Sequence, residues 1–257
     1  MARTHVDYDQ IAVTYNERYT VRNMERVAAA LRCLVQSAGA RRILEVGCGT
    51  GHWLAELRPI AHQVVGLDLS LGMLGQARQR RMPLELVCGQ ATALPFPEAG
   101  FDLLFCVNAF HHFGDQRAFL AEARRLLRPG GALATIGINP HTGPTQWYLY
   151  RYFEGTYETD LRRYPSPGTI LDWMVETGFA RVEWQVAERI LHPLVGREVL
   201  NDPFLRKNST SQLALLSDEA YAVGLRRIEA ALAEAEAGGK RLVFPVDIPL
   251  AMVTGYV

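Results

Sequence analysis

The chain has 257 residues, and its 27 basic and 27 acidic side chains give a formal net charge of zero. This balance disfavours a protein that binds polyanions, which would carry a basic excess or a basic tail. Hydrophobic residues make up 49% of the chain, enough to offset the entropy of ordering, so a disordered chain is excluded. The four cysteines show no metal-ligand spacing, and neither a signal peptide nor an apolar run of about 20 residues occurs. We therefore expect a compact, cytoplasmic protein with no metal site and no membrane partner.

Strand-like and helix-like segments alternate in the first half of the chain. A helical pattern over about 8–36 comes first, with an apolar stripe that includes Val27 and Leu31. Short apolar runs that read as strands then occupy 42–46, 63–67, 84–88, 101–107 and 132–138. Helices are expected between them, one of them capped by Ser70. Apolar strands separated by amphipathic helices indicate a mostly parallel, doubly wound, Rossmann-like α/β sheet.

The second half departs from this alternation. An aromatic stretch is followed by a predicted helix over 169–177, closed by Gly178, and a strand over 181–186. Residues 188–245 read as mostly helical, and 246–257 as a last strand, the seventh of the sheet. We expect one domain over 1–257. Its parts are an N-terminal helical lid (1–36), a cofactor-binding core (37–140), an aromatic segment with a helix and a strand (141–187), a helical cap insertion (188–245) and the final strand (246–257).

A glycine-rich turn joins the first predicted strand to the first core helix. Gly47, Gly49 and Gly51 allow the backbone to turn tightly and to approach a ligand closely. Asp68 ends the second strand, where a carboxylate can accept hydrogen bonds from both hydroxyls of a ribose. A dinucleotide fingerprint would need glycine where His52 stands. The pattern therefore indicates a nucleoside-containing cofactor other than a dinucleotide.

Five sequence blocks in order resemble the class I S-adenosylmethionine-dependent methyltransferases, of the type 11 or ubiquinone-biosynthesis-methyltransferase-like group. The blocks are Glu45 to Gly51, Gly66 to Leu74, Ala93 to Pro97, Phe101-Asp102 and Leu127 to Gly131. The resemblance implies S-adenosylmethionine as cofactor and S-adenosylhomocysteine as product. It also implies a set of cofactor-binding residues: Tyr15, Glu45, Gly47, Cys48, Gly49, Gly51, Asp68, Leu69, Met73, Gln90, Ala91 and Asn108.

The resemblance assigns most of these residues a part of the cofactor. Glu45 and the glycine loop would surround the methionine end, and Leu69 and Met73 would pack on the adenine. Gln90 stands where many relatives have an acidic residue that accepts from the adenine amino group. Tyr15 or Tyr19 would close the lid on the cofactor carboxylate, although aromatic packing of an N-terminal helix explains both equally well.

Candidates for contact with the methyl acceptor lie after the fourth and fifth strands. His111 and His112 follow Asn108 at the carboxyl end of the fourth strand, so either can act as a general base or merely order the site. Several aromatic residues and two clusters of cationic residues are further candidates, with core packing and solvent exposure as alternatives. They are Trp147, Tyr148, Tyr150, Tyr152, Tyr157, Arg151, Arg162, Arg163 and the turn from Arg206 to Ser211.

The hypothesis from sequence is in-line methyl transfer to a small-molecule acceptor. The neutral charge and the helical insertion favour this substrate class over tRNA or rRNA, which would call for a basic stripe. A non-catalytic protein that binds S-adenosylmethionine is the second alternative. Neither the acceptor atom nor the oligomeric state can be read from the residues.

Overall fold

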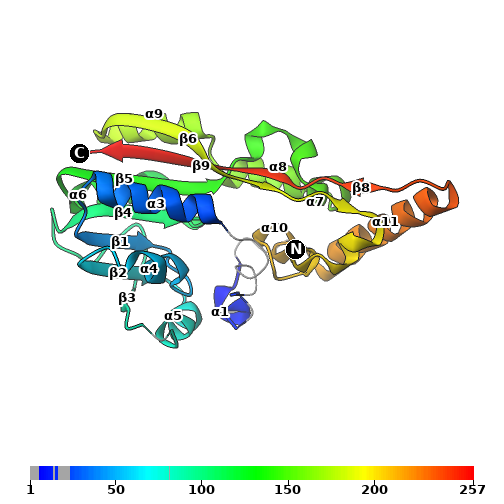
Figure 1. Cartoon of the computed structure of the whole chain (residues 1–257), viewed down its shortest axis with the longest axis horizontal. Helices are drawn as coiled ribbons and strands as arrows, with labels where there is room; N and C mark the ends of the chain where they lie inside the picture. Colours follow the sequence, from blue (N-terminus) through cyan, green and yellow to red (C-terminus); the bar gives the residue numbers. More distant parts are fainter. Residues whose placement is uncertain (1–5, 14, 17–23, 81) are drawn as a thin grey trace.

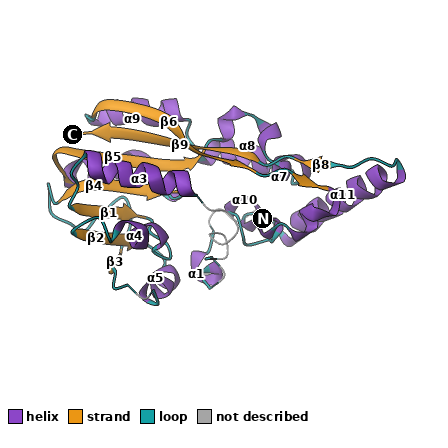
Figure 2. Cartoon of the chain, viewed as in Figure 1, coloured by secondary structure: helices purple, strands orange, loops and turns teal. Residues whose placement is uncertain are grey.

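Seven strands form one sheet in the order β3-β2-β1-β4-β5-β9-β6 in the computed structural model, which describes residues 6–13, 15, 16, 24–80 and 82–257 (Figures 1 and 2). The strands are β1 (Arg42–Val46), β2 (Gln63–Asp68), β3 (Glu85–Cys88), β4 (Phe101–Val107), β5 (Leu127–Ile138), β6 (Ala180–Leu191) and β9 (Asp247–Tyr256). Strands β1 to β5 are parallel, whereas β9 runs antiparallel to both β5 and β6. The predicted Rossmann-like, mostly parallel seven-stranded sheet is confirmed.

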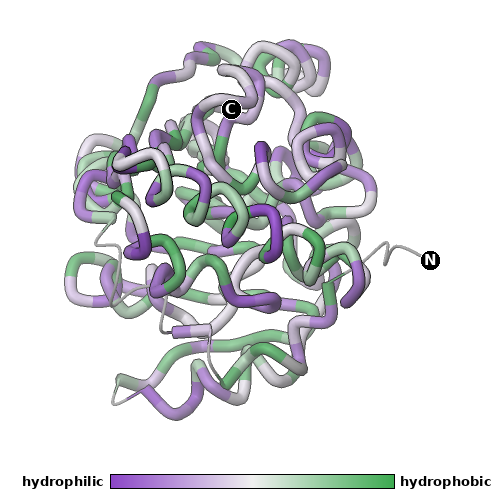
Figure 3. Tube along the Cα trace, turned by 90° about the vertical axis from the view of Figure 1, so that its right-hand side faces the viewer, coloured by the Kyte–Doolittle hydropathy of each residue, from purple (hydrophilic) through white to green (hydrophobic). Residues whose placement is uncertain are grey.

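Helices cover both faces of this sheet because successive strand residues are apolar on opposite sides. On β1, Ile43 packs in the hydrophobic cluster that contains α3 (Glu25–Ser37) and α4 (His52–Leu57). Its neighbour Leu44 belongs to a second cluster, which contains α6 (Gln116–Leu126) and α9 (Pro167–Thr177). The short helix α5 (Leu71–Arg78) packs beside α4. Hydrophilic and hydrophobic residues alternate along the coils around the sheet (Figure 3), as one-sided burial requires.

The predicted helix ends rest on capping groups. The Ser70 hydroxyl accepts a hydrogen bond from the backbone of Met73 at the start of α5. Gly178 adopts a left-handed conformation after α9, and Ser217 caps α11 (Asp218–Ala237). Ser70 and Gly178 start and stop their helices for the local reason that the sequence indicated, and Ser217 acts in the same way as Ser70.

The N-terminal and cap segments depart from the helices expected there. The described part of residues 8–36 forms α1 (Tyr8–Ile11) and α3, not one continuous helix. Within 188–245, β6 continues to Leu191, because its pairing with β9 extends to Leu191 opposite Asp247. The rest of the segment contains β7 (Leu194–Val195), η4 (Gly196–Asn201), η5 (Pro203–Leu205), α10 (Ser211–Ala214), α11 and β8 (Val243–Phe244). Strands β7 and β8 pair as a separate ribbon.

The cap shares its hydrophobic core with the sheet. Between β5 and α9 lie η2 (Pro140–Thr142), η3 (Pro144–Gln146), α7 (Tyr148–Tyr152) and α8 (Thr156–Arg163), and η1 (Phe110–His112) follows β4. One continuous cluster joins Phe105 of β4 to Phe153 after α7 and to Ile228 of α11. No helix in the described ranges is both long and apolar enough to span a membrane.

Packing of α11 against α7 gives a stability prediction. A Cβ at Gly224 in α11 would stand 2.2 Å from Cδ1 of Phe153, so Gly224→Ala must displace a buried ring. We expect the free energy of unfolding to fall by about 1–3 kcal/mol. The control is Gly75→Ala in α5, where nothing lies within 4 Å and the helix should gain up to about 1 kcal/mol. Chemical denaturation measures both variants, and an unchanged Gly224→Ala would contradict the packing of α11.

Candidate functional site

A cavity of about 640 Å³ lies at the carboxyl ends of β1, β2, β3 and β4. This is the edge at which doubly wound sheets bind ligands. All the predicted cofactor-binding residues line it except Glu45, Cys48 and Gly51. Those that do are Tyr15, Gly47, Gly49, Asp68, Leu69, Met73, Gln90, Ala91 and Asn108. The two predicted histidines, His111 and His112, line the same cavity.

The glycine loop after β1 can exist only without side chains at its turning points. Gly47 has a φ of +74°, and a Cβ there would stand 2.5 Å from Cβ of Ala109. Gly49 has a φ of +52°, and a Cβ there would approach the Tyr15 ring at 3.8 Å. The backbone N–H groups of Gly47 and Cys48 both donate to the carbonyl of Leu67, which ties the loop to β2. The open backbone beside the cavity fits the close approach of a cofactor.

Asp68 is held in place by the backbone on two sides. Its Oδ2 accepts from the N–H of Gly49 at 2.7 Å, and its Oδ1 accepts from the N–H of Ser70 at 2.9 Å. Burial raises the pKa of Asp68 above its ordinary value, although these N–H groups act in the opposite direction. A carboxylate at the end of β2 that faces the cavity fits the ribose contact expected from sequence.

The structure places Glu45, Cys48 and Gly51 outside the cavity wall. Glu45 is 1% exposed, and its Oε2 has no hydrogen-bond partner among the described residues. Burial, together with the charge of Asp68, raises the pKa of Glu45 well above its ordinary value. Cys48 packs with Leu54 and other apolar residues, and burial raises the pKa of its thiol. Gly51 begins α4, where a Cβ would stand 2.7 Å from Leu84.

The N-terminal segment covers one side of the cavity. Tyr8 and Tyr15 line it, whereas Tyr19 lies outside the described residues. Asp9 attaches the segment to the start of α5: its Oδ1 accepts from the Ser70 hydroxyl at 2.6 Å and from the N–H of Gly72 at 2.7 Å. These bonds lower the pKa of Asp9. Thr50 adds a hydrogen bond to the side chain of Asn16 at 2.6 Å.

Asn108 turns the chain from β4 toward the histidines. It has a φ of +51°, in the left-handed region that asparagine tolerates better than most side chains. The next turn is η1, which carries His111 and His112. Nε2 of His111 lies 2.7 Å from the Tyr164 hydroxyl, and Nε2 of His112 lies 2.6 Å from the Tyr8 hydroxyl. Burial is the main cause of a pKa of His111 well below its ordinary value.

A second cavity, of about 100 Å³, adjoins the first. Its wall contains Val6, Tyr8, Tyr15, Asn108, His111 and His112, which also line the first cavity. The remainder is mostly apolar or aromatic, with a polar edge from α10 and the turn before it. These residues are Ile11, Met24, Ile138, Trp147, Tyr164, Ile190, Phe204, Ser209, Thr210, Ser211, Gln212 and Ile248. We call it the inner cavity, and the larger one the cofactor cavity.

Sequence reasoning found only part of the inner cavity. Of the five aromatic candidates, only Trp147 is in this wall. Four belong to the largest hydrophobic cluster, and Tyr157 packs against it; the four are Trp147, Tyr148, Tyr150 and Tyr152. The turn predicted from Arg206 to Ser211 contributes its last three residues. Tyr8 and Tyr164 were not singled out, although Tyr8 lies in the expected N-terminal lid (1–36). Their pairing with histidines more than 50 residues away leaves no local pattern to find.

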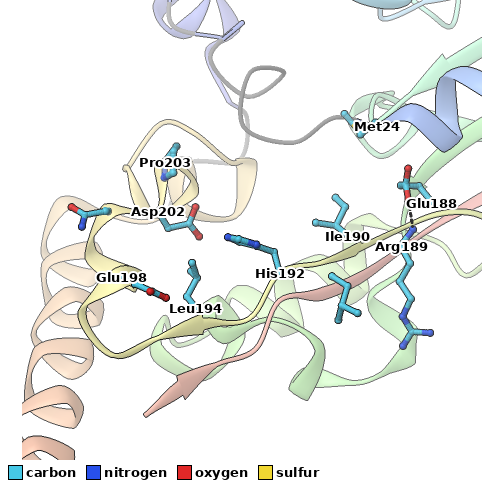
Figure 4. A pocket seen from close by; sticks show the side chains of 11 residues that line it. Met24, Glu188, Arg189, Ile190, His192, Leu194, Glu198, Asp202 and Pro203 are labelled. Atoms are coloured by element: carbon cyan, nitrogen blue, oxygen red, sulfur yellow. Dashed lines mark hydrogen bonds between the residues drawn. The ribbon is translucent and has the colours of Figure 1, made fainter. Parts of the chain in front are cut away.

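A third cavity, of about 360 Å³, lies between β6 and the η4–η5 region (Figure 4). His192, Glu198 and Asp202 line it, and it contains no predicted cofactor-binding residue. It shares Met24 and Ile190 with the inner cavity. Among the residues that the structure describes, no group of three or more His, Cys, Asp or Glu side chains could hold a metal ion.

Comparisons with known proteins give a consistent result. Residues 44–135 match the family model of a methyltransferase domain. A demethylmenaquinone methyltransferase of Deinococcus radiodurans is 33% identical over 178 residues, which are 60% of this chain and 73% of the relative. A second enzyme of that name, from Renibacterium salmoninarum, is 27% identical over 199 residues, 69% of this chain and 84% of the relative. A solved phosphoethanolamine N-methyltransferase 2 of Haemonchus contortus, in complex with S-adenosyl-L-methionine, shares the fold with a TM-score of 0.59. It is 15% identical, and the match covers 98% of this chain and 60% of that one.

Loss of the Asp68 carboxylate should weaken cofactor binding. Asp68→Ala removes the expected ribose acceptor and leaves the N–H groups of Gly49 and Ser70 without their present partner. Hydrogen bonds to a charged group are worth about 1.5–3 kcal/mol, so the Kd for S-adenosylhomocysteine should rise roughly 10- to 100-fold. Calorimetric titration measures this, with Asp115→Ala as the control, because Asp115 also lines the cavity but caps α6. An unchanged Kd in Asp68→Ala would refute the assignment.

The attachment of the lid can be tested at Asp9. Asp9→Ala removes two hydrogen bonds to the start of α5, one to Ser70 and one to Gly72. We expect proteolysis before Glu25 to become faster and cofactor affinity to fall by less than in Asp68→Ala, because Asp9 does not line the cavity. Limited proteolysis with mass spectrometry identifies the cut site. Asp172→Ala, which removes an exposed carboxylate from α9, serves as the control, and equal cleavage in both variants would contradict the role of Asp9.

Proposed function

The chain belongs to the class I S-adenosylmethionine-dependent methyltransferases, and we propose that its acceptor is a small molecule with an apolar ring that binds in the inner cavity. The observation that carries this proposal is the shared wall of the two cavities. Asn108, His111 and His112 border both of them, so a molecule in the inner cavity would face the cofactor across these side chains.

The lining of the inner cavity suits a ring better than a charged chain. Ile138, Ile190 and Ile248 come from the strands β5, β6 and β9, and Trp147 and Phe204 add aromatic surface. Such apolar walls with a few polar groups are typical of sites for small organic ligands. The two relatives named demethylmenaquinone methyltransferase support a small-molecule acceptor of this kind.

Most of the protein's contribution is positioning. S-adenosylmethionine supplies an activated methyl group on a positively charged sulfur. The glycine loop and Asp68 would hold the cofactor, while Asn108 and η1 would set the direction from which the acceptor approaches. The lid residues Tyr8 and Tyr15 would exclude water from both cavities. His111 and His112 are the side chains that would touch the acceptor, either as a base or as hydrogen-bond donors.

The two alternatives from the sequence, an RNA acceptor and a non-catalytic protein, have no comparable support. Among the described residues, no observation favours an RNA acceptor or a protein that binds the cofactor without catalysis. The small-molecule reading explains the inner cavity directly, because the cavity adjoins the cofactor cavity and has a mostly apolar wall.

Blocking the inner cavity should separate acceptor binding from cofactor binding. Ile190→Trp would fill part of the inner cavity, whereas Val186→Trp alters an exposed site on the same strand. Release of S-adenosylhomocysteine is measured with a panel of phenols, hydroquinones and aromatic amines. We expect turnover of at least one ring class by the parent and Val186→Trp, and a loss of roughly 10-fold or more in kcat/KM in Ile190→Trp. Its affinity for S-adenosylhomocysteine should stay unchanged. Turnover of tRNA or rRNA, with none of any ring compound, would contradict the proposal.

A further inference from the structure

A cationic side chain stands where the two cavities meet. Arg163, in the last turn of α8, lines the cofactor cavity, and its side chain is 17% exposed. One terminal nitrogen lies 3.4 Å from Nδ1 of His112, and the other lies 3.3 Å from the hydroxyl of Ser211. His112 and Ser211 both line the inner cavity. The guanidinium is therefore beside the groups that would touch the acceptor.

A buried carboxylate orients this guanidinium from behind. Asp160, one turn earlier on α8, is 0% exposed, and its Oδ1 lies 3.5 Å from Arg163. Its Oδ2 accepts from the Tyr150 hydroxyl at 2.8 Å and from the Gln212 amide at 2.6 Å. Burial raises the pKa of Asp160 to about 6 although these donors and Arg163 favour its charged form. Asp160 lines neither cavity, so it can position Arg163 without meeting a ligand.

The contacts of Arg163 are longer than strong charge-assisted hydrogen bonds. They are 3.3 to 3.5 Å long, whereas charge-assisted bonds to an anion are typically about 2.7–2.9 Å. A guanidinium has five N–H donors and no acceptor. An anionic oxygen beside Arg163 would therefore bind the guanidinium more tightly than the neutral groups now in contact with it.

The same contact fixes the proton on His112. Because a guanidinium only donates, Nδ1 of His112 must accept, so the neutral imidazole carries its proton on Nε2. That nitrogen lies 2.6 Å from the Tyr8 hydroxyl at the edge of the inner cavity. His112 thus donates to the Tyr8 hydroxyl, on the side of its ring away from Arg163. Burial is the largest cause that lowers the pKa of His111, and the charges of His112 and Arg163 add to it.

We infer that Arg163 and the Ser211 hydroxyl form an oxyanion-binding site and that the acceptor is bound as a phenolate- or enolate-type anion. This inference rests on the proposed function, because it specifies the chemical class of the acceptor. Arg163 is then a specificity-determining residue, and Asp160 is its positioning residue. The arrangement removes the need for a general base on the enzyme.

The electron balance of the transfer agrees with a bound anion. An oxyanion that attacks the methyl carbon supplies the pair for the new O–C bond, and the pair of the broken C–S bond stays on sulfur. The products are a neutral methyl ether and neutral S-adenosylhomocysteine, and no proton moves. If the attacking atom is a ring carbon conjugated to the oxyanion, that carbon loses its proton to solvent in a later step.

A chromophoric phenol tests the site without turnover. The complex of the protein with S-adenosylhomocysteine is titrated with 4-nitrophenol and with its neutral isostere 4-nitroanisole. We expect the parent to prefer 4-nitrophenol and to retain the phenolate absorption band at a pH where the free compound has lost it. Both probes are titrated at the same pH, so the other ionisable groups near the ligand start from the same protonation state in the two titrations. They are Tyr8, Tyr15, His111, His112, Tyr150, Asp160 and Tyr164 around the boundary, and Asp68, Asp115 and Arg162 around the cofactor cavity.

Three variants identify Arg163 as the cause. In Arg163→Gln, affinity for 4-nitrophenolate should fall roughly 10- to 100-fold, while affinity for 4-nitroanisole stays the same. Arg163→Lys keeps the charge and should restore part of the preference. Arg151→Gln removes an exposed cation of the neighbouring helix α7 and should behave as the parent. Asp160→Asn/Arg163→Gln removes both charges and checks that no unpaired buried carboxylate is responsible.

Each result that contradicts the inference excludes a different part of it. Equal binding of the two probes by the parent, or equal loss in Arg163→Gln and Arg151→Gln, would overturn the oxyanion site but leave the inner cavity intact. A weaker affinity of Arg163→Gln for S-adenosylhomocysteine would assign Arg163 to the cofactor instead. Failure of both probes to bind, with normal binding of S-adenosylhomocysteine, would reject the inner cavity and with it the proposed function.

Discussion

The contact between the turns after β1 and β4 is the constraint on which the site depends. Gly47 and Ala109 approach so closely that a single added Cβ would stand 2.5 Å from its neighbour. Because β1 and β4 are adjacent and parallel, both turns leave the sheet at the same edge. The first turn forms part of the cofactor cavity, and the second passes through the positive φ of Asn108 into η1. One close contact therefore sets where the cofactor would lie and where the histidines stand.

The rest of the wall comes from segments that the chain brings back from far away. Tyr8 reaches His112 across 104 residues, and Tyr164 reaches His111 across 53. The hydroxyl of Ser211, the first residue of α10, accepts a hydrogen bond from Arg163 of α8. The cap and the sheet share one hydrophobic cluster, so these distant groups rest on a common core. The inner cavity exists only because three separate parts of the chain meet over the sheet edge.

The difference between local features and contacts across long stretches of chain explains what could be predicted from the sequence. The sheet, its helices and the position of the cavity-lining residues at the strand ends were predictable, since apolar runs, capping residues and glycine turns are local signals. The path of β6 into the cap was not, because its pairing with β9 overrides the helical pattern there. Glu45 and Cys48 were assigned cofactor contacts by resemblance, whereas their burial depends on the packing of α4 and β2, which no local pattern specifies. The contact of Arg163 with His112, 51 residues away, is likewise tertiary, whereas its pairing with Asp160 lies within one helix.

The buried Asp160 is hard to explain by stability. A buried ion pair is seldom more stabilising than apolar residues of the same volume, because both charges lose their hydration. Asp160 has no exposed surface, yet Tyr150, Gln212 and Arg163 are all arranged around it. These four residues lie outside residues 44–135, the stretch that matches the methyltransferase domain model. The sheet and its helices would thus provide the features common to cofactor binding. The polar arrangement of α7, α8 and α10 would lower stability in the free protein, and binding of this chain's own ligand would offset that loss.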